Sequence, residues 1–195
     1  MNKSNITGLI LAGGQARRMG GVDKGLLAFK DQAMILHVIK RLSPQVETLL
    51  INANREIEAY ERFGLPVMSD QIHDFAGPLA GLHAGMQATK TEFVLSVPCD
   101  SPLLPEDLAS RLMAALITHH AEIAVAKTGT QRQSVFCLCR KSLVADLADY
   151  LKAGGRKVDT WQNSHALTEV CFDDNPQAFS NINTAEELSA LERVC

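Results

Sequence analysis

The sequence lacks the excess of basic residues that is typical of nucleic-acid-binding proteins. Its 195 residues include 19 Lys and Arg against 22 Asp and Glu, which gives a formal net charge of −3. A protein that binds nucleic acid usually carries a clear surplus of positive charge. The charge balance therefore disfavours a nucleic-acid partner, although it leaves room for local basic clusters.

Long apolar runs are also missing. A membrane-spanning helix needs about 20 consecutive apolar residues, and no run in this chain approaches that length. The first residues, Met-Asn-Lys-Ser-Asn, lead directly into an expected strand rather than into the charged-then-apolar pattern of a signal segment. We therefore expect a cytoplasmic protein that does not interact with a membrane.

Cysteines are few, odd in number and scattered, and no CxxC motif occurs. In a chain of this length that pattern argues against a disulfide framework. No His/Cys spacing suggests a zinc site either. We expect apolar fillers or surface thiols at all five positions: Cys99, Cys137, Cys139, Cys171 and Cys195.

The chain contains no linker, repeat or low-complexity segment, so residues 1–195 are predicted to form one domain. Its first half alternates apolar runs with segments of helical periodicity. Strands are expected at 6–12, 47–52, 65–69 and 92–98, and helices at 33–42, 56–63, 78–89 and 105–119. This alternation predicts a parallel sheet with helices on both faces and right-handed crossovers.

The pattern changes after residue 120. Apolar strands at 122–127 and 134–140, joined by "TGTQRQ", are expected to pair antiparallel. Helices are expected at 142–152 and 156–162, a strand at 168–172, and a last helix that starts at the capping box formed by Thr184 and Glu187. The predicted fold class is α/β: a Rossmann-like, three-layer α/β/α domain whose mostly parallel sheet has a small antiparallel excursion.

Residues 8–25, "GLILAGGQARRMGGVDKG", combine a buried strand, a glycine pair and a cluster of positive charge. Ligands of open α/β sheets bind beyond the carboxyl ends of the strands, and backbone amides near a glycine turn favour phosphate. Arg17, Arg18 and Lys24 would repel one another unless an anion is present. A phosphate-binding loop is therefore favoured over a solvated basic turn.

Two familiar phosphate loops do not match this segment. The Walker A pattern GxxxxGK[ST] fails because Lys24 is preceded by Asp23 and followed by Gly25. The dinucleotide fingerprint GxGxxG fails because Gln15 and Arg18 stand where glycines are required.

Two carboxylates follow apolar runs and are candidates for a metal site. Asp70 ends "LPVMSD", and Asp100 ends "FVLSVPCD", where Pro98 and Pro102 bracket it. Mg²⁺ is usually held by one or two carboxylates together with phosphate oxygens and waters. Asp100 is the better candidate, and the alternative for either residue is a helix cap or an ordered turn.

Other residues at this predicted edge have two interpretations each. Asn52 ends the strand at 47–52, either as a turn residue or as a hydrogen-bonding partner for a base or ribose. Gly77, Gly81 and Gly85 are four residues apart, a spacing that leaves one helix stripe free of side chains. That stripe serves either close helix packing or the approach of a ligand.

Six segments occur in one order: "LAGGQARRMGGVDKG", "INANR", "SD" at 69–70, "GPLAGL", "PCDSPL" and "NINTAEEL". Together they resemble the molybdenum cofactor guanylyltransferase family, nucleotidyltransferases with a Rossmann-like fold, over about residues 6–192. The resemblance implies transfer of GMP from GTP to the terminal phosphate of molybdopterin, release of pyrophosphate, and Mg²⁺ as the cofactor. The guanine dinucleotide form of the molybdenum cofactor would be the product.

The resemblance also implies a set of site residues and a division of the domain. GTP-binding positions fall on Leu11, Ala12, Gly13, Gly14, Lys24, Asn52, Asp70 and Asp100, and Asp100 also holds the metal. Catalysis is assigned to Lys24, Asp100 and Arg18. Molybdopterin-binding positions are Gln133, Arg156, Asn181 and Asn183. GTP would thus bind the half at about 1–120, and molybdopterin the half at about 121–195.

One stretch departs from the family pattern. Relatives commonly have His-Pro or Gln-Pro where this chain has Gln133-Ser134, which puts the local contact to molybdopterin in question. The basic loop "GGRKV" at 154–158 resembles a family loop, and Arg156 and Lys157 are expected to face the pterin phosphate.

Three other functions stay open at this point. A cytidylyltransferase or a sugar-phosphate nucleotidyltransferase of the same fold would use a similar edge, and a non-catalytic GTP-binding module would need no Asp100. Expected substrates are GTP and molybdopterin, and contacts with proteins that deliver molybdopterin or mature molybdoenzymes are a further expectation. We expect a monomer or a weak oligomer.

Overall fold

The computed structural model describes residues 5–13, 23–72 and 77–179. Within them, seven strands form one sheet in the order β5-β4-β1-β6-β8-β7-β9. Their bounds are β1 (Ile6–Leu11), β4 (Thr48–Asn52), β5 (Val67–Met68), β6 (Phe93–Pro98), β7 (Ile123–Thr128), β8 (Gln131–Arg140) and β9 (Leu167–Cys171). All neighbours pair parallel except β8, which runs antiparallel to both β6 and β7. The mostly parallel sheet with an antiparallel excursion is confirmed.

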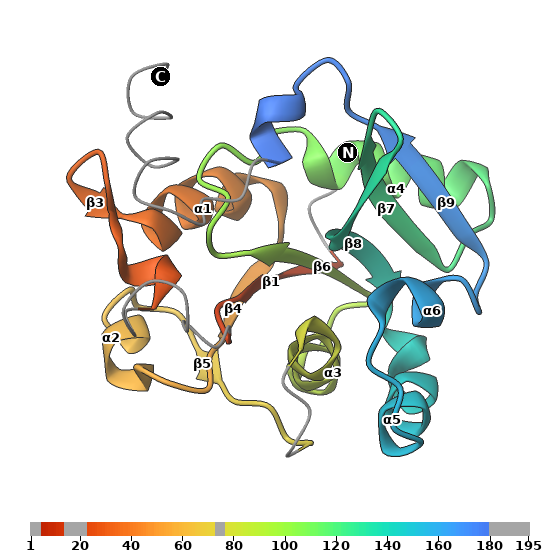
Figure 1. Ribbon diagram of the computed structural model, residues 1–195, viewed down its shortest axis with the longest axis horizontal. Coiled ribbons are helices and arrows are strands. Elements are labelled where there is room, and N and C mark those ends of the chain that lie inside the picture. The colour runs from red at the N-terminus through yellow and green to blue at the C-terminus, as the bar shows by residue number, and fades with distance from the viewer. Residues whose placement is uncertain (1–4, 14–22, 73–76, 180–195) are drawn as a thin grey trace.

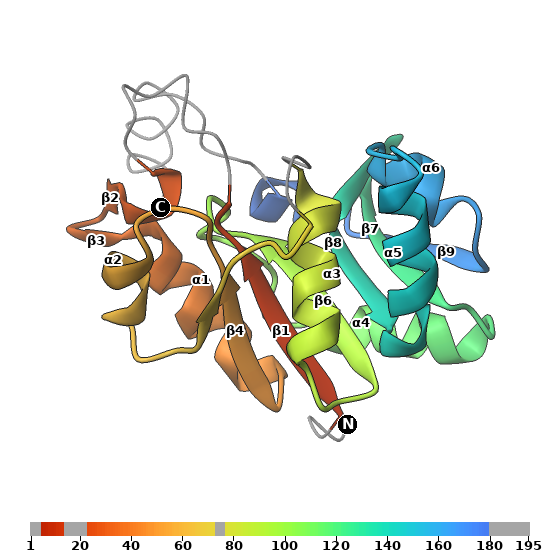
Figure 2. The ribbon, with the colours of Figure 1, turned by 90° about the horizontal axis from the view of Figure 1, so that it is seen from below.

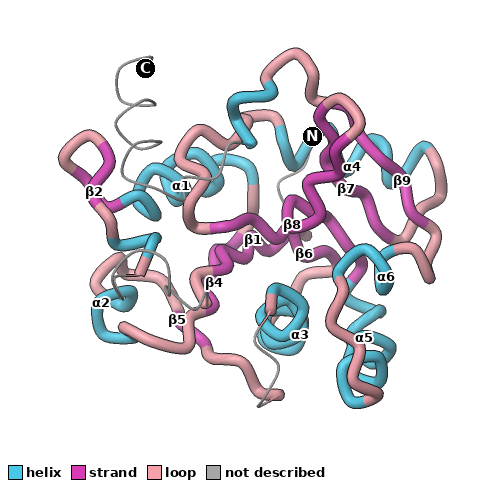
Figure 3. Tube along the Cα trace, viewed as in Figure 1, coloured by secondary structure: helices cyan, strands magenta, loops and turns pink. Residues whose placement is uncertain are grey.

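Helices cover both faces of this sheet (Figure 1). One face carries α1 (Met34–Leu42) and α4 (Leu108–Thr118), and the other carries α3 (Pro78–Ala88), α5 (Val144–Lys152) and α6 (Val158–Gln162). Figure 2 shows α3 and α5 lying side by side across the strands, and Figure 3 shows the three layers by secondary structure. The predicted three-layer α/β/α architecture is confirmed.

Each face of the sheet has its own apolar core. Because side chains of a strand alternate between faces, Leu9 and Ile10 of β1 enter different cores. Leu9 belongs to the cluster that contains Leu82 of α3, whereas Ile10 belongs to the one that contains Val38 of α1 and Leu112 of α4. The near-continuous apolar character of 6–12 reflects burial on both sides.

Smaller elements depart from the sequence prediction. A two-stranded hairpin, β2 (Ala28–Phe29) with β3 (Gln32–Ala33), was not expected. Its turn places Lys30 at φ 48° and Asp31 at φ 61°, both without glycine. A short helix, α2 (Ile57–Glu61), falls inside the expected 56–63 segment.

The expected loop "TGTQRQ" is wrong in extent. Residues 131–133 continue β8, and only Gly129, at φ 54°, and Thr130 form the turn. The hydrogen bond from the amide of Gly129 to the carboxylate of Asp173 helps to fix this tight turn.

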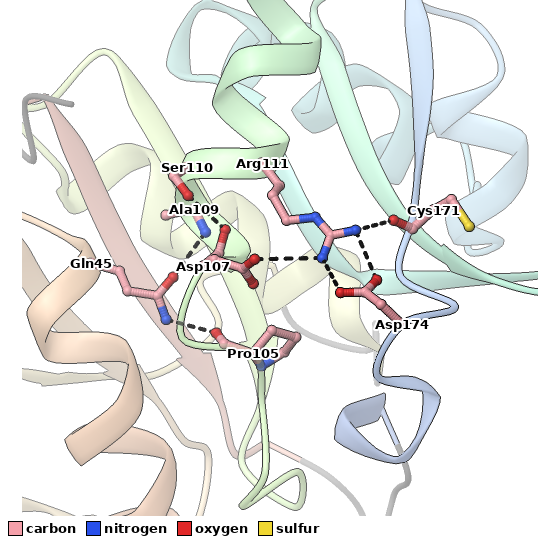
Figure 4. Close-up of polar contacts among 8 residues, drawn as sticks. All are labelled: Gln45, Pro105, Asp107, Ala109, Ser110, Arg111, Cys171 and Asp174. Carbon is pink, nitrogen blue, oxygen red and sulfur yellow. Dashed lines mark hydrogen bonds and ion pairs between the residues drawn. The ribbon is translucent and has the colours of Figure 1, made fainter.

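Helix α4 begins at Leu108 rather than at the expected Pro105, and Gln45 explains the difference (Figure 4). Continuing the helix would require the amide of Ala109 to donate to the carbonyl of Pro105. Instead, Ala109 N donates to Gln45 Oε1 at 2.9 Å, and Gln45 Nε2 donates to Pro105 O at 2.8 Å. The Gln45 side-chain amide therefore satisfies both groups, and the helix begins after Pro105 instead of at it.

Arg111 of α4 holds the segment that follows β9 (Figure 4). Its guanidinium lies 3.8 Å from the centre of the Phe172 ring and donates to both carboxylate oxygens of Asp174, at 2.8 and 3.0 Å. The side-chain hydrogen bond to Asp174 raises the pKa of Arg111. The chain that leads from β9 toward residue 179 is thereby fastened to the helix layer.

Two further observations concern membrane spans and cysteines. In the part of the chain that the structure describes, no helix is both long and apolar enough to cross a bilayer. Cys99, Cys137, Cys139 and Cys171 are all free thiols.

The expected last helix at Thr184 lies outside the described residues.

Candidate active site

The carboxyl ends of four parallel strands lie level with one another. Leu11 at the end of β1 pairs with Asn52 of β4 on one side and with Pro98 of β6 on the other, and Asn52 pairs with Met68 of β5. The residues that follow these strands therefore share one edge of the sheet, as the sequence predicted. Leu11 and Ala12 belong to the pairing itself, since Ala12 N donates to Asn52 O at 2.8 Å.

Lys24 and Asp100 meet at this edge although they are 76 positions apart in sequence. Lys24 Nζ donates to Asp100 Oδ2 at 3.1 Å. The side chains are 28% and 12% exposed, respectively, so the pair is partly accessible and largely shielded from water. A carboxylate and an ammonium in this setting are placed to act on a phosphate and its counterion.

A short 3-10 turn presents Lys24. The turn spans Lys24–Leu26, and Asp23 caps it by accepting a hydrogen bond from Gly25 N at 3.3 Å. Asp23 is itself buried and accepts a second hydrogen bond from the Tyr60 hydroxyl. Neither Asp23 nor Tyr60 was predicted as a site residue, although the "DKG" triplet is a sequence signal for this turn.

Asn52, Asn54 and Asp70 form a second polar group at the same edge. Asp70 Oδ1 accepts from Asn52 Nδ2 at 2.9 Å, and Asp70 Oδ2 accepts from Asn54 Nδ2 at 2.8 Å. The amide of Asp70 in turn donates to Asn54 Oδ1 at 2.8 Å. Both carboxylate oxygens of Asp70 are thus engaged by amides, which favours Asp100 over Asp70 as the metal ligand.

Asn54 was not predicted as a site residue because it lies beyond the end of the strand, where only the strand-terminal Asn52 was expected to reach a ligand. The "INANR" segment did carry a signal, since residues two apart on an extended chain share a side. Gly13 lies against both amides: a Cβ there would be 3.1 Å from Asn54 Nδ2 and 3.4 Å from Asn52 Oδ1. The first loop and the Asn52–Asp70 group are therefore contiguous.

The glycines of α3 serve close packing. A Cβ at Gly85 would lie 2.5 Å from Leu9 Cδ2, and one at Gly81 would lie 2.3 Å from Asn52 Oδ1. Among the described residues, and leaving out its chain neighbours, no atom lies within 4 Å of a Cβ built at Gly77. Of the two interpretations left open, helix-to-sheet packing fits Gly81 and Gly85, and Gly81 also makes room for the Asn52 side chain.

An irregularity in β8 brings Gln133 to the same edge. The pairing of β7 with β8 jumps from Val125↔Cys137 to Ala126↔Gln133, so residues 134–136 bulge out of the ladder. Ser96 of β6 donates to the carbonyl of Val135 at 2.7 Å and thereby satisfies part of the bulge. Bulges re-aim side chains and are frequent beside active sites.

The residue that departs from the family pattern, Ser134, connects this bulge to α6. Its hydroxyl is hydrogen-bonded to the carboxylate of Asp159, and its carbonyl accepts from Gln162 Nε2 at 2.9 Å. Gln133 Nε2 donates to Thr128 Oγ1 at 2.8 Å. Arg156 is exposed in the loop before α6. The structure thus places these side chains on the β8 side of the edge, next to α6.

Four predicted site residues lie outside the described residues: Gly14, Arg18, Asn181 and Asn183. Their assignments stay predictions.

The donor set at the edge suits a metal ion that phosphate helps to bind. Over residues 5–13, 23–72 and 77–179, no group of three or more His, Cys, Asp or Glu side chains is placed to hold a metal. Mg²⁺ does not require such a cage, because it retains waters and takes one or two carboxylates plus phosphate oxygens. The carboxylate of Asp100 fits that role.

The fold and this site define a class of enzymes, the nucleotidyltransferases. A family model described as "MobA-like NTP transferase domain" matches residues 8–167. The structure of molybdopterin-guanine dinucleotide biosynthesis protein A from Archaeoglobus fulgidus superposes with a TM-score of 0.81 at 21% identity, over 97% of this chain and 98% of that one. The 4-diphosphocytidyl-2C-methyl-D-erythritolsynthase of Anaerococcus prevotii gives 0.76 at 12% identity, over 99% of both chains. These two structures show the fold alone.

Sequence relatives narrow the class. The molybdenum cofactor guanylyltransferase of Ralstonia pickettii is 52% identical, over 96% of this chain and 96% of its own length. That of Cupriavidus pinatubonensis is 50% identical, over 97% of this chain and 98% of its own. The chain belongs to the molybdenum cofactor guanylyltransferase family, and the resemblance drawn from the sequence motifs is confirmed.

Proposed function

We propose that this enzyme transfers GMP from GTP to the terminal phosphate of molybdopterin and releases pyrophosphate, as its family membership implies. The observation that carries the proposal is the contact between Lys24 Nζ and Asp100 Oδ2 at 3.1 Å, at the level ends of the parallel strands. A cation and a metal-binding carboxylate at this edge are what an in-line transfer between two polyanions requires.

The reaction asks for positioning and charge stabilisation rather than for a strong base. A phosphate oxygen of molybdopterin attacks the α-phosphorus of GTP, a new P–O bond forms, and the bond to the β-phosphate bridging oxygen breaks. The electron pair leaves with pyrophosphate. Because the attacking oxygen is already an anion, holding the two anions in line against their repulsion accounts for most of the catalysis.

The GTP-binding half, at about residues 1–120, supplies the charges for this transfer. Lys24 would stabilise negative charge at the α-phosphate and let the second anion approach. Asp100 would hold Mg²⁺, which supplies neutralisation of the phosphate charge when it is bound. The amides of Gly13 and Gly14, with Arg18, are assigned to the β- and γ-phosphates.

The Asn52–Asp70 group is assigned to the nucleoside of GTP. Asn52 and Asp70 are already linked by a 2.9 Å hydrogen bond, so their donors and acceptors are held in place before a ligand arrives. Leu11 and Ala12 are assigned to the same nucleotide site, as backbone and apolar contacts. Prearranged groups lose less conformational entropy on binding.

Molybdopterin is assigned to the half at about residues 121–195. Gln133 on the β8 bulge and Arg156 before α6 would bind it together with Asn181 and Asn183. The exposed guanidinium of Arg156 is suited to a phosphate because it can donate two parallel hydrogen bonds.

Several expectations accompany the proposal without bearing on the site. We expect a cytoplasmic location, and the four free thiols suit a reducing compartment. We also expect a monomer or weak oligomer that meets proteins delivering molybdopterin or maturing molybdoenzymes, and no nucleic-acid or membrane partner.

The choice of base and the occurrence of transfer are tested together. Purified protein would be incubated with Mg²⁺ and each of GTP, CTP, ATP and UTP, with and without molybdopterin, and pyrophosphate release would be measured. We expect release with GTP only, and only when molybdopterin is present. Equal or faster release with CTP would favour the cytidylyl reaction, and GTP binding without release at saturating acceptor would favour a non-catalytic module.

A further inference from the structure

A buried cluster beneath Lys24 joins three segments that are distant in sequence. Asp23 and Gly25 flank Lys24, Tyr60 comes from α2, and Cys99 immediately precedes Asp100. Tyr60 is fully buried, and Asp23 and Cys99 are 8% and 7% exposed. Both members of the Lys24–Asp100 pair are therefore attached to the same packed group.

The carboxylate of Asp23 bridges Tyr60 to the turn that carries Lys24. Its Oδ1 accepts from the Tyr60 hydroxyl at 2.5 Å and from the amide of Gly25 at 3.3 Å. Burial raises the pKa of Asp23, whereas the hydrogen bond from Tyr60 lowers it. The hydroxyl thus offsets part of the cost of keeping a charged carboxylate in this position.

Gly25 fits closely between the side chains of this cluster. A Cβ on Gly25 would lie 2.7 Å from the Tyr60 hydroxyl oxygen and 3.2 Å from both Cβ and Sγ of Cys99. The backbone next to Lys24 is therefore packed closely against both Tyr60 and Cys99, the residue that precedes Asp100. Burial also raises the pKa values of Tyr60 and Cys99, so the hydroxyl stays a donor and the thiol stays neutral.

We propose that Tyr60 is a positioning residue for the transfer reaction: through Asp23 and Gly25 it fixes the turn at Lys24, so that the ammonium is held at Asp100. Tyr60 does not touch the reacting atoms itself. Its contribution passes through the backbone on either side of Lys24. The kinetic part of the test rests on the proposed function, and the spectroscopic part does not.

The Tyr60→Phe variant keeps the buried ring and removes only the hydroxyl. We expect kcat to fall roughly tenfold, because a small displacement of a charged group in an active site costs rate steeply. We expect little change in KM for GTP. Asp23→Asn, whose amide oxygen still accepts both hydrogen bonds, is expected to retain more activity than Asp23→Ala.

A matched control separates positioning from general stability. Thr91 carries a buried hydroxyl that donates to Phe93 O at 2.9 Å, just before β6 begins, at the opposite end of the sheet from Asp100. Thr91→Val is expected to lower Tm to a similar extent and to leave kcat unchanged. A parallel loss of kcat in this control would overturn the inference.

A double-mutant cycle shows whether Tyr60 acts through Lys24. In the Lys24→Ala background, Tyr60→Phe is expected to cost no further activity, because residues that act as a unit are not additive. Fully additive losses would contradict a route through Lys24 and would leave Tyr60 as a packing residue.

The spectroscopic arm does not depend on turnover. With lysines labelled by reductive ¹³C-methylation, the Lys24 resonance, assigned by its absence in Lys24→Ala, is expected to shift in Tyr60→Phe and not in Thr91→Val. An unchanged resonance in Tyr60→Phe would overturn the inference. If Tyr60→Phe shows this shift but the wild-type protein shows no transfer, the proposed function would be refuted and the positioning of Lys24 by Tyr60 would stand.

Discussion

On the β5-β4-β1-β6 side of the sheet, the candidate site residues bond to one another, whereas on the β8-β7-β9 side the candidate Gln133 bonds to a residue that is not assigned to the site. Lys24 meets Asp100, and Asn52 meets Asp70, across long sequence separations. On the second side, Gln133 donates to Thr128, which is only five residues away in the same hairpin.

This difference follows from the strand directions. The last residues of parallel strands in register lie at one level, so the parallel register alone brings their polar groups together. The reversed strand β8 instead presents its beginning at that edge, and a bulge decides which side chains face it. Under the proposed function, the first side would bind GTP and the second side would bind molybdopterin.

The largest effect is expected from Asp100→Asn, which keeps the size of the side chain and removes its charge. Mg²⁺-dependent transfer should fall by about 10³-fold or more, because the metal and its neutralising charge are lost together. The measurement is pyrophosphate release across a Mg²⁺ titration, with circular dichroism to confirm the fold. Full activity in this variant would show that Asp70 or another group holds the metal. It would contradict the assignment of Asp100 as the Mg²⁺ ligand on the β5-β4-β1-β6 side.

Lys24→Ala should have the next largest effect. Its loss should cut transfer about 10²-fold while Tm changes little, since one preorganised charge contact is removed. Single-turnover kinetics with saturating GTP and acceptor would measure the chemical step directly. A rate within about threefold of the wild type would remove Lys24 from the mechanism.

Arg156→Ala tests the second side. Because Arg156 is exposed and assigned to the acceptor phosphate, KM for molybdopterin should rise about tenfold while KM for GTP stays the same. Initial rates with each substrate varied in turn would separate the two constants. A rise in KM for GTP alone would reverse the assignment of the two halves.

The smallest effect is expected from Glu169→Gln on β9. Glu169 accepts from Lys127 and Arg132, each at 2.7 Å, and these contacts lower its pKa below the ordinary 4.5. A carboxyl whose pKa is lowered by folding stabilises the protein above its unfolded pKa and loses that contribution as pH falls through the folded one.

The wild type should therefore be more stable than Glu169→Gln at neutral pH, by at most ~1 kcal/mol because the pair is exposed. The difference should vanish in acid. Urea unfolding of both proteins between neutral pH and about pH 3 checks this. A difference that persists at the acid end would show that packing rather than charge holds β9 to β7.

The sequence predicted those parts of the fold and site that depend on repeating rules. Alternating strands and helices indicate a parallel sheet, and the register of that sheet brings Asn52, Asp70 and Asp100 to one edge. Lys24 could be placed there because it closely follows the first strand. The placement of Asn52, Asp70 and Asp100 depends on backbone direction more than on side-chain packing.

What the sequence did not predict depends on particular side-chain contacts. The Tyr60–Asp23 hydrogen bond requires α2 to dock against the turn at Lys24, and no periodicity encodes that docking. The start of α4 depends on Gln45, which is distant in sequence. The sequence does not predict the β8 bulge either, because a hydrophobic pattern of period two does not mark which residues leave the hydrogen-bonded ladder.

The separation of the two sides is tested most directly by titrating GTP with Mg²⁺ into protein without molybdopterin. Asn52→Ala and Arg156→Ala would be compared with the wild type by isothermal titration calorimetry. GTP should bind Arg156→Ala with the wild-type Kd. It should bind Asn52→Ala about tenfold or more weakly, because Asn52→Ala loses a prearranged hydrogen-bonding partner of the nucleotide. Equal weakening in both variants would contradict a GTP site built on the β5-β4-β1-β6 side alone.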